Sequence, residues 1–326
     1  MLGKSQGWEV NWRRGTFARV TQCRQQLYGE SMQHDDAKPF DRELLARRRN
    51  RFASVAGAHD FLLRRVADDI GERLQIVQRD FPKALNLGAH NGAVSELIRR
   101  LPNVGLVIDA DACDAMLSAC AGPRVRCDEE ALPFTDGVFD LVVSGLSLQF
   151  VNDLPGTFVQ VRKALKADGL FLAAMLGGET LKELRQSWLS AEADMLGGAS
   201  PRVAPFADVR ALGSLAQRAG FALPVADSET ITVTYGSPLA LMQDLRAMGA
   251  SNMLTGRRRV PVTRGLVQRA CEIYADLFAL YDGRVPATFE ILSLTAWVPH
   301  ESQPKPLVPG SGKISLAKVL GSKTED

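Results

Sequence analysis

Helical and strand-like segments alternate through the middle of the chain, and this alternation constrains the fold more than any other feature. Apolar residues spaced three and four apart predict a helix from Leu63 to Phe81, followed by a short strand over 84–87. Further strands are predicted at 105–109, just before Asp128, at 140–144 and at 170–175, in alternation with helical segments. Alternating helices and strands build a parallel sheet that is covered on both faces.

The last two strands are spaced differently from the first five. Alternating apolar residues predict one strand at 231–235 and the other at 289–296, with helices over 241–248 and 266–281 between them. A strand pair that closes one edge of a parallel sheet distinguishes class I methyltransferases from nucleotide dehydrogenases. We therefore expect a doubly wound, mostly parallel seven-stranded α/β sheet of the class I methyltransferase type, with a helical cap insertion.

This pattern divides the chain into parts with different expected roles. They are a poorly ordered extension (1–37), a cofactor-binding core (38–176), a helical cap insertion (177–228), C-terminal strands and helices that complete the sheet (229–300), and a tail (301–326). Within the insertion, Leu184, Trp188, Ala191 and Met195 form an apolar helical stripe, which we expect to pack onto the sheet.

The composition excludes several kinds of partner. Of the residues, 46% are hydrophobic and 23% are charged, and the formal net charge is +2, too small to imply a nucleic acid partner. No apolar run approaches the length of a membrane span, so any membrane association is expected to be peripheral, through a partner. The five cysteines contain no CxxC pair, and an odd number does not suggest a disulfide framework.

A glycine-containing turn follows the first predicted strand. Ligands of doubly wound sheets bind beyond the carboxyl ends of the strands, where such a turn lets the backbone approach them and a helix N-terminus offers free N–H groups. Gly88, Ala89, His90 and Gly92 occupy that place and are candidate cofactor-binding residues. His90 stands where a GxGxG pattern has its middle glycine, so its ring must either crowd the ligand or pack beside it.

Acidic residues follow the next two strands. Asp111, with Ala112 beside it, lies about twenty residues after the glycine turn, where a carboxylate can accept both hydroxyls of a ribose. Asp128 and Glu129 follow the third strand, where an adenine amino group could donate to a carboxylate. Ser144, at the end of the next strand, is assigned to the same site. Together these residues predict a nucleoside site, with S-adenosylmethionine as the cofactor.

Longer motifs indicate a resemblance closer than a shared fold. The chain resembles the NADH dehydrogenase (complex I) assembly factor 5 family, a class I S-adenosylmethionine-dependent methyltransferase-like family, over about residues 38 to 320. Core motifs that carry the resemblance lie at 128–130, 132–134, 139–144, 146–148 and 151–155. Motifs at 174–181, 200–206, 285–288 and 300–303 are more specific, because general methyltransferases do not share these cap and tail sequences.

The resemblance implies hydroxylation of an arginine in an iron-sulfur subunit of complex I, on a methyltransferase scaffold, as an aid to assembly. It implies a cytoplasmic location in a bacterium and a mitochondrial matrix location in a eukaryote. Gly88, Gly92 and Asp111 match the family's cofactor residues, as do Asp128 and Glu129 on the adenine side.

The chain departs from the family pattern at three places. These are Asn86, where an acid is usual, His90 in place of the middle glycine, and Gln149-Phe150 where His-Trp is common. The departures concern the affinity for the cofactor and not the fold.

The catalytic group does not follow from the sequence. Gln149 and His300 are candidates near the expected mouth of the cleft, and Glu179, after the fifth strand, is the candidate acceptor for a substrate arginine. A two-histidine, one-carboxylate metal site would need His34 and Asp36 in a polar segment together with a distant histidine, so no metal ligand is assigned.

Two other functions stay open. One is that of the related malonyl-carrier-protein O-methyltransferases of biotin synthesis, although the motifs at 177–180 and 300–303 favour the assembly-factor branch. The other is a non-enzymatic assembly chaperone with a degenerate cofactor site, which Asn86 and His90 support.

Overall fold

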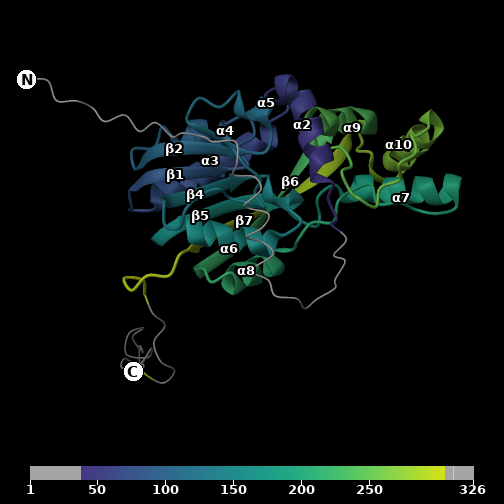
Figure 1. Ribbon diagram of the computed structural model, residues 1–326. Helices are drawn as coiled ribbons and strands as arrows, with labels where there is room; N and C mark the ends of the chain where they lie inside the picture. The colour runs from purple at the N-terminus through teal and green to yellow at the C-terminus, as the bar shows by residue number, and fades with distance from the viewer. Residues whose placement is uncertain (1–37, 305–310, 312–326) are drawn as a thin grey trace, which may run out of the picture. The chain divides into compact units, whose positions relative to one another are not determined.

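A twisted seven-stranded sheet with helices on both faces forms the body of the protein in a computed structural model, which describes residues 38–304 and Ser311 (Figure 1). The strand order is β3-β2-β1-β4-β5-β7-β6. Neighbouring strands pair in parallel from β3 to β5, and β7 pairs antiparallel with both β5 and β6. The predicted fold class is confirmed, including the strand pair that closes one edge.

The elements follow the chain in a regular alternation. The strands are β1 (Phe81–Leu87), β2 (Val104–Asp111), β3 (Arg124–Arg126), β4 (Phe139–Gly145), β5 (Leu165–Leu176), β6 (Ala222–Tyr235) and β7 (Val285–Trp297). The helices are α2 (Arg42–Ala56), α3 (Phe61–Ile76), α4 (Ala93–Ile98), α5 (Asp114–Leu117), α6 (Leu154–Ala164), α7 (Lys182–Leu196), α8 (Val209–Arg218), α9 (Pro238–Ala247) and α10 (Arg264–Phe278), with a 3-10 turn, η1, at Leu148–Phe150.

Side chains of successive strand residues pack alternately into two separate hydrophobic cores, one on each face of the sheet. Ala84 packs with α3 and α4, whereas the next residue, Leu85, packs with α6 and α8. This is the consequence of side chains alternating across a strand. Because both faces are buried, the central strands are almost wholly apolar, as parallel strands usually are.

Three helices from the C-terminal half gather beyond one end of the strands. Figure 1 shows α7, α9 and α10 together on that side, with the N-terminal helix α2 next to them. In the predicted stripe of α7, Leu184, Trp188 and Ala191 are buried, whereas Met195 is 48% exposed. The helix packs on α10 more than on β7, so much of the stripe contacts another helix and not the sheet.

Some predicted boundaries were wrong. The helix expected from Leu63 to Phe81 ends at Ile76, and Phe81 begins β1, because the residue before Pro82 is disfavoured in helical conformation.

β5 and β6 begin earlier than their apolar patterns predict. The strand predicted at 170–175 is β5, which begins at Leu165 and pairs irregularly with β4 at its start. β6 begins at Ala222, inside the range 177–228 expected for the insertion. As an edge strand it is largely exposed, so its first half carries little apolar alternation. Residues 1–37, with His34 and Asp36, and most of the tail lie outside the described residues.

Candidate functional site

The glycine turn after β1 has the geometry that its sequence predicts. Gly88 and Gly92 have φ values of +69° and +84°, in the left-handed region that favours glycine. A Cβ at position 88 would lie 2.1 Å from the Cβ of Ser147, and one at position 92 would lie 3.3 Å from the Cα of Cys120. The turn therefore depends on glycine at both positions, for conformation and for space.

Position 86 carries Asn where an acid is usual in the family, and the neighbouring strand β2 carries an acid, Asp109, opposite it. Asn86 pairs with Asp109 in the β1–β2 register, and its Nδ2 donates a hydrogen bond of 2.9 Å to the Asp109 carboxylate. Asp109 also forms an ion pair with Arg99. A second carboxylate at position 86 would face Asp109 in the interior and repel it. An amide at position 86 thus suits the carboxylate of Asp109, and the glycine turn that follows keeps its geometry.

His90 adopts the left-handed backbone conformation that is typical of glycine. Its φ is +50°, and its amide donates to Asp111 Oδ2 at 3.0 Å. The ring Nε2 lies 3.1 Å from the carbonyl oxygen of Leu146, so Nε2 must carry the proton. Burial, with a contribution from the Arg49 cation, lowers the pKa of His90 to about 3, and the ring is neutral at physiological pH.

This neutral histidine should make stability depend on pH. The native pKa lies below the unfolded value near 6.5, so the unfolded state gains a proton first as the pH falls. Stability is fully present above pH 6.5 and is lost toward pH 3, by about 2 kcal/mol at pH 5. We expect urea unfolding to show this loss in the native chain and to show a smaller one in His90→Asn, which does not titrate. Equal slopes for the two proteins would contradict a neutral, half-buried His90.

Asp111 ends β2 directly under the glycine turn. One carboxylate oxygen accepts from the His90 amide and the other accepts from the amide of Cys113 at 2.8 Å. Burial raises the pKa of Asp111, although the Arg49 cation and these two hydrogen bonds oppose the rise. Each oxygen keeps a free lone pair, so the carboxylate can still accept hydroxyl donors.

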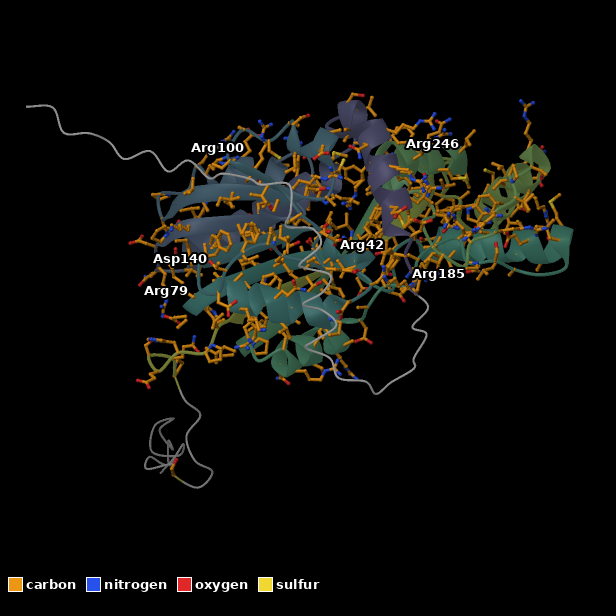
Figure 2. The ribbon with its side chains drawn as sticks, in the orientation of Figure 1. Arg42, Arg79, Arg100, Asp140, Arg185 and Arg246 are labelled. Atoms are coloured by element: carbon orange, nitrogen blue, oxygen red, sulfur yellow. The ribbon has the colours of Figure 1, made fainter. Side chains whose placement is uncertain are left out.

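Glu129, after β3, is joined to the N-terminal helix α2. It is 2% exposed, accepts from Ser147 Oγ at 2.6 Å, and forms an ion pair with Arg42, which also binds Asp128 at 2.8 Å. Burial alone would raise the pKa of Glu129, but Arg42 and Ser147 together hold that pKa below its usual value. Figure 2 labels Arg42 where α2 meets the sheet.

Helix α2 closes the end of the site where the sequence predicts a nucleoside. The cavity between it and the strand ends has a volume of about 20 Å³, room for about one water molecule, and its walls include Asp111, Ala112, Glu129 and Ser147. Arg49 of α2 also lines this cavity. It is 6% exposed, and within the part of the chain that the structure describes its guanidinium has no hydrogen bond or ion pair.

A second cavity of about 320 Å³ lies between the sheet and the cap helices. His90 and Asn91 of the glycine turn form one part of its wall, and Arg49 lines both cavities. Most of the remaining wall is apolar, with contributions from α2, α3, α7, α9 and the loop after α9. A cavity of this size, with few polar groups, is typical of a small-molecule or side-chain site.

Several predicted residues do meet at this edge of the sheet. Gly88, His90, Asp111, Glu129 and Gln149 surround the two cavities or the turn between them. Ala89 and Gly92 belong to the turn itself, and Ala112 lines the smaller cavity.

Other predicted residues lie elsewhere. Ser144 is fully buried inside the sheet, and its hydroxyl donates to the carbonyl oxygen of Leu87 at 2.7 Å, so it lines neither cavity. Asp128 is on the surface and binds Arg42. Glu179 is also exposed, pairs with Lys182 and lines neither cavity. The expected place of Glu179 in the cleft was wrong.

His300 lies at the opposite edge of the sheet. Because β7 runs antiparallel to β5, its carboxyl end lies beside the amino end of β5, where Trp297 pairs with Leu170. His300 is exposed there and contacts Ser302. Its expected place near the mouth of the cleft was wrong.

Four residues that sequence reasoning missed belong to the site. Arg42 and Arg49 come from α2, which the sequence analysis did not predict, while Asp60 and Ser147 lie in short connections. The one local signal is Asp41, whose side chain caps α2 by accepting from the amide of Leu44.

The described part of the chain holds no group of three or more His, Cys, Asp or Glu side chains placed to bind a metal ion. In the same part, every helix is too short or too polar to cross a membrane.

The sequence is similar to proteins of two related kinds. The arginine-hydroxylase NDUFAF5 of Danio rerio is 37% identical over 286 residues, covering 86% of this chain and 89% of that protein. The mitochondrial NDUFAF5 of Homo sapiens is 38% identical over 287 residues, covering 86% and 83%. The chain belongs to the NDUFAF5 arginine-hydroxylase family. A malonyl-[acyl-carrier protein] O-methyltransferase of Halorhodospira halophila is 35% identical over 277 residues, covering 82% and 91%, so this second kind is more distant from the NDUFAF5-family chain.

The family's core is a methyltransferase fold. A methyltransferase domain model matches residues 85–173, which include the glycine turn and β4. A Bacillus halodurans protein assigned as a methyltransferase superposes with a TM-score of 0.51 at 16% identity, covering 71% of this chain and 98% of that protein. The match agrees with the sheet described above.

Proposed function

We propose that this NDUFAF5-family chain binds S-adenosylmethionine and hydroxylates an arginine of an iron-sulfur subunit during assembly of respiratory complex I. The observation that carries the proposal is the 37% identity to an arginine-hydroxylase over 86% of the chain. The mitochondrial relatives favour a mitochondrial location if the host is a eukaryote.

The donor and acceptor set of the smaller cavity fits the proposed cofactor. Asp111 can accept ribose hydroxyls, Glu129 can accept an adenine amino group, and the unpaired Arg49 would hold the carboxylate of the methionyl group. The volume does not yet fit, so α2 must shift and Arg42 must release Glu129 before a nucleoside enters. When bound, the cofactor would supply an electrophilic methyl group for methyl transfer; hydroxylation of an arginine C–H bond requires in addition dioxygen as the oxidant and two reducing electrons, which would have to come from outside the described residues.

The larger cavity supports a side-chain substrate. It begins at His90 and Asn91, which are part of the cofactor turn, and extends under the cap. An adjoining position of this kind brings a substrate group to the cofactor without exposing it to bulk water.

One observation favours the malonyl-carrier-protein methyltransferase as a second candidate. Arg49 lines both cavities, and an unpaired cation could equally bind the free carboxylate of a malonyl group. The higher identity to NDUFAF5 ranks this function second.

Gene deletion separates these functions. We expect the deletion strain to contain less assembled complex I, and its iron-sulfur subunit to lack an added oxygen on one arginine by mass spectrometry. Restoring the gene should restore both. Normal complex I with a new requirement for biotin would establish the carrier-protein methyltransferase instead. Failed assembly with a normally oxygenated arginine would indicate a chaperone.

A further inference from the structure

One carboxylate faces the larger cavity. Among the described residues that line it, Asp60 is the only acidic one, and its side chain is 8% exposed. Asp60 Oδ2 accepts from Asn91 Nδ2 of the cofactor turn at 2.8 Å, and Oδ1 accepts from Arg64 Nε at 2.8 Å. Arg64 is 61% exposed, and a pair with so exposed a cation contributes little. The carboxylate is therefore available to a cation that enters the cavity.

Gln149 lines the same cavity, and its side chain carries a buried amide oxygen. Gln149 is 8% exposed, and its Nε2 donates to the carbonyl oxygen of Leu146 at 2.8 Å. Its Oε1 is buried and has no hydrogen-bond partner among the described residues. Buried acceptors are seldom left unpaired in folded proteins, because an unpaired acceptor loses its hydrogen bonds to water without replacement. A donor on a bound molecule would satisfy it.

Arg49 and Arg202 also line the larger cavity, so their charges must be considered before a further cation is placed there. Arg202 forms an ion pair with Glu192, which is 1% exposed, and lies 4.4 Å from the ring centroid of Trp188. Arg49 also lines the nucleoside cavity, whose wall contains Asp111 and Glu129. Arg202 is thus neutralised by a direct ion pair, whereas Arg49 has no direct pair and only shares the wall of the smaller cavity with two carboxylates; Asp60 remains as the acceptor next to α3.

We propose that the larger cavity is the binding site for a guanidinium side chain, with Asp60 and Gln149 Oε1 as its acceptors. The assignment rests on the arginine-directed function proposed above and deepens it. A guanidinium presents five N–H donors in a plane, enough for a carboxylate and an amide oxygen together. Apolar residues such as Leu63 and Leu184 would contact its aliphatic stem.

Peptide binding tests the assignment directly. The full chain is titrated in a calorimeter with the blocked peptide Ala-Gly-Arg-Gly-Ala and with the same peptide carrying citrulline, which is nearly isosteric but uncharged. We expect the arginine peptide to bind better, and Asp60→Asn to weaken it by about 10- to 100-fold, as for loss of a charge-assisted hydrogen bond. The citrulline peptide should be affected much less.

Two further variants guard the interpretation. Asp68→Asn removes a carboxylate from the exposed side of α3, the helix that begins directly after Asp60, and should leave peptide binding unchanged. Gln149→Met keeps the volume but removes the amide oxygen, and should weaken the arginine peptide by about 3- to 10-fold, as for a neutral hydrogen bond. It does not alter Asp60, so it serves if Asp60→Asn proves unstable.

Each outcome decides the assignment. Selective loss of the arginine peptide in Asp60→Asn, with normal binding in Asp68→Asn, supports it. Equal binding of the arginine and citrulline peptides by the native chain, or unchanged arginine binding in both Asp60→Asn and Gln149→Met, overturns it. The proposed function is judged separately by the oxygen on the subunit arginine in cells, so the two can fail independently.

Discussion

Replacing Gly88 with alanine should abolish cofactor binding and destabilise the protein by about 2–4 kcal/mol. The left-handed backbone contributes about 1–2 kcal/mol of this loss, because a Cβ is unfavourable there. The rest comes from overlap with Ser147, whose Cβ would lie 2.1 Å away. Moving Ser147 would also disturb its hydrogen bond to Glu129. We expect more than a 100-fold loss of affinity for S-adenosylhomocysteine by calorimetry, and a lower urea midpoint.

Gly137 provides a matched control. Its φ is +67°, almost the same as that of Gly88, but a Cβ there would meet no atom within 4 Å. Gly137→Ala should therefore lose only the conformational part, about 1–2 kcal/mol, and bind the cofactor normally. Equal losses of stability and normal affinity in both variants would show that the turn does not need the space at position 88.

The proximity of the candidate cofactor residues could be predicted from the sequence, because it depends on the order of the strands along the chain. In a parallel sheet the carboxyl ends of neighbouring strands meet at one edge. The residues after β1, β2 and β3 must then approach one another, whatever their surroundings. Gly88, Asp111 and Glu129 were found in this way, and the structure brings them together.

The errors at Glu179 and His300 have different physical causes. His300 follows β7, which was expected to close the sheet edge in a different way from the first five strands. The prediction did not take into account that β7 runs antiparallel to β5, so that its carboxyl end lies at the opposite edge. β7 runs from the cavity side to the far edge, so any residue after it lies away from the site. Glu179 does follow the carboxyl end of β5, but its side chain points into solvent and pairs with Lys182.

The contribution of α2 could not be predicted, because it depends on contacts across the chain. Arg42 and Glu129 are 87 residues apart, and no local pattern links a basic helix to that carboxylate. A run of three arginines, Arg47 to Arg49, has the composition of a solvated helix face, yet Arg49 is buried and lines both cavities. Asp60 was missed for the same reason, because its role depends on the turn of Asn91 and the cap helices beside it.

Arg42→Met should destabilise the protein by about 3–5 kcal/mol, because it leaves Glu129 buried without its cation. Adding Glu129→Gln should recover a large part of the loss, since a neutral amide can still pair with Ser147 and needs no counter-charge. Urea unfolding of both single variants and the double variant measures this coupling directly. Additive losses would mean that the ion pair contributes little, and that α2 opens freely over the nucleoside end.

The contribution of Glu129 to the pH dependence should change sign in the same variant. In the native chain the pKa of Glu129 is held below its usual value, so the stability it contributes is present at neutral pH and is lost as the pH falls through its folded pKa. Without Arg42, burial raises the pKa of Glu129 above its unfolded value, and protonation on acidification should then stabilise the folded state. His90 loses stability on the same acidification in both variants, so a melting temperature of Arg42→Met that falls less between pH 7 and pH 5 than that of the double variant would assign the effect to Glu129. A parallel response in both would place the titrating group elsewhere, and α2 would then be held mainly by other contacts, such as the pair between Arg257 and Asp41.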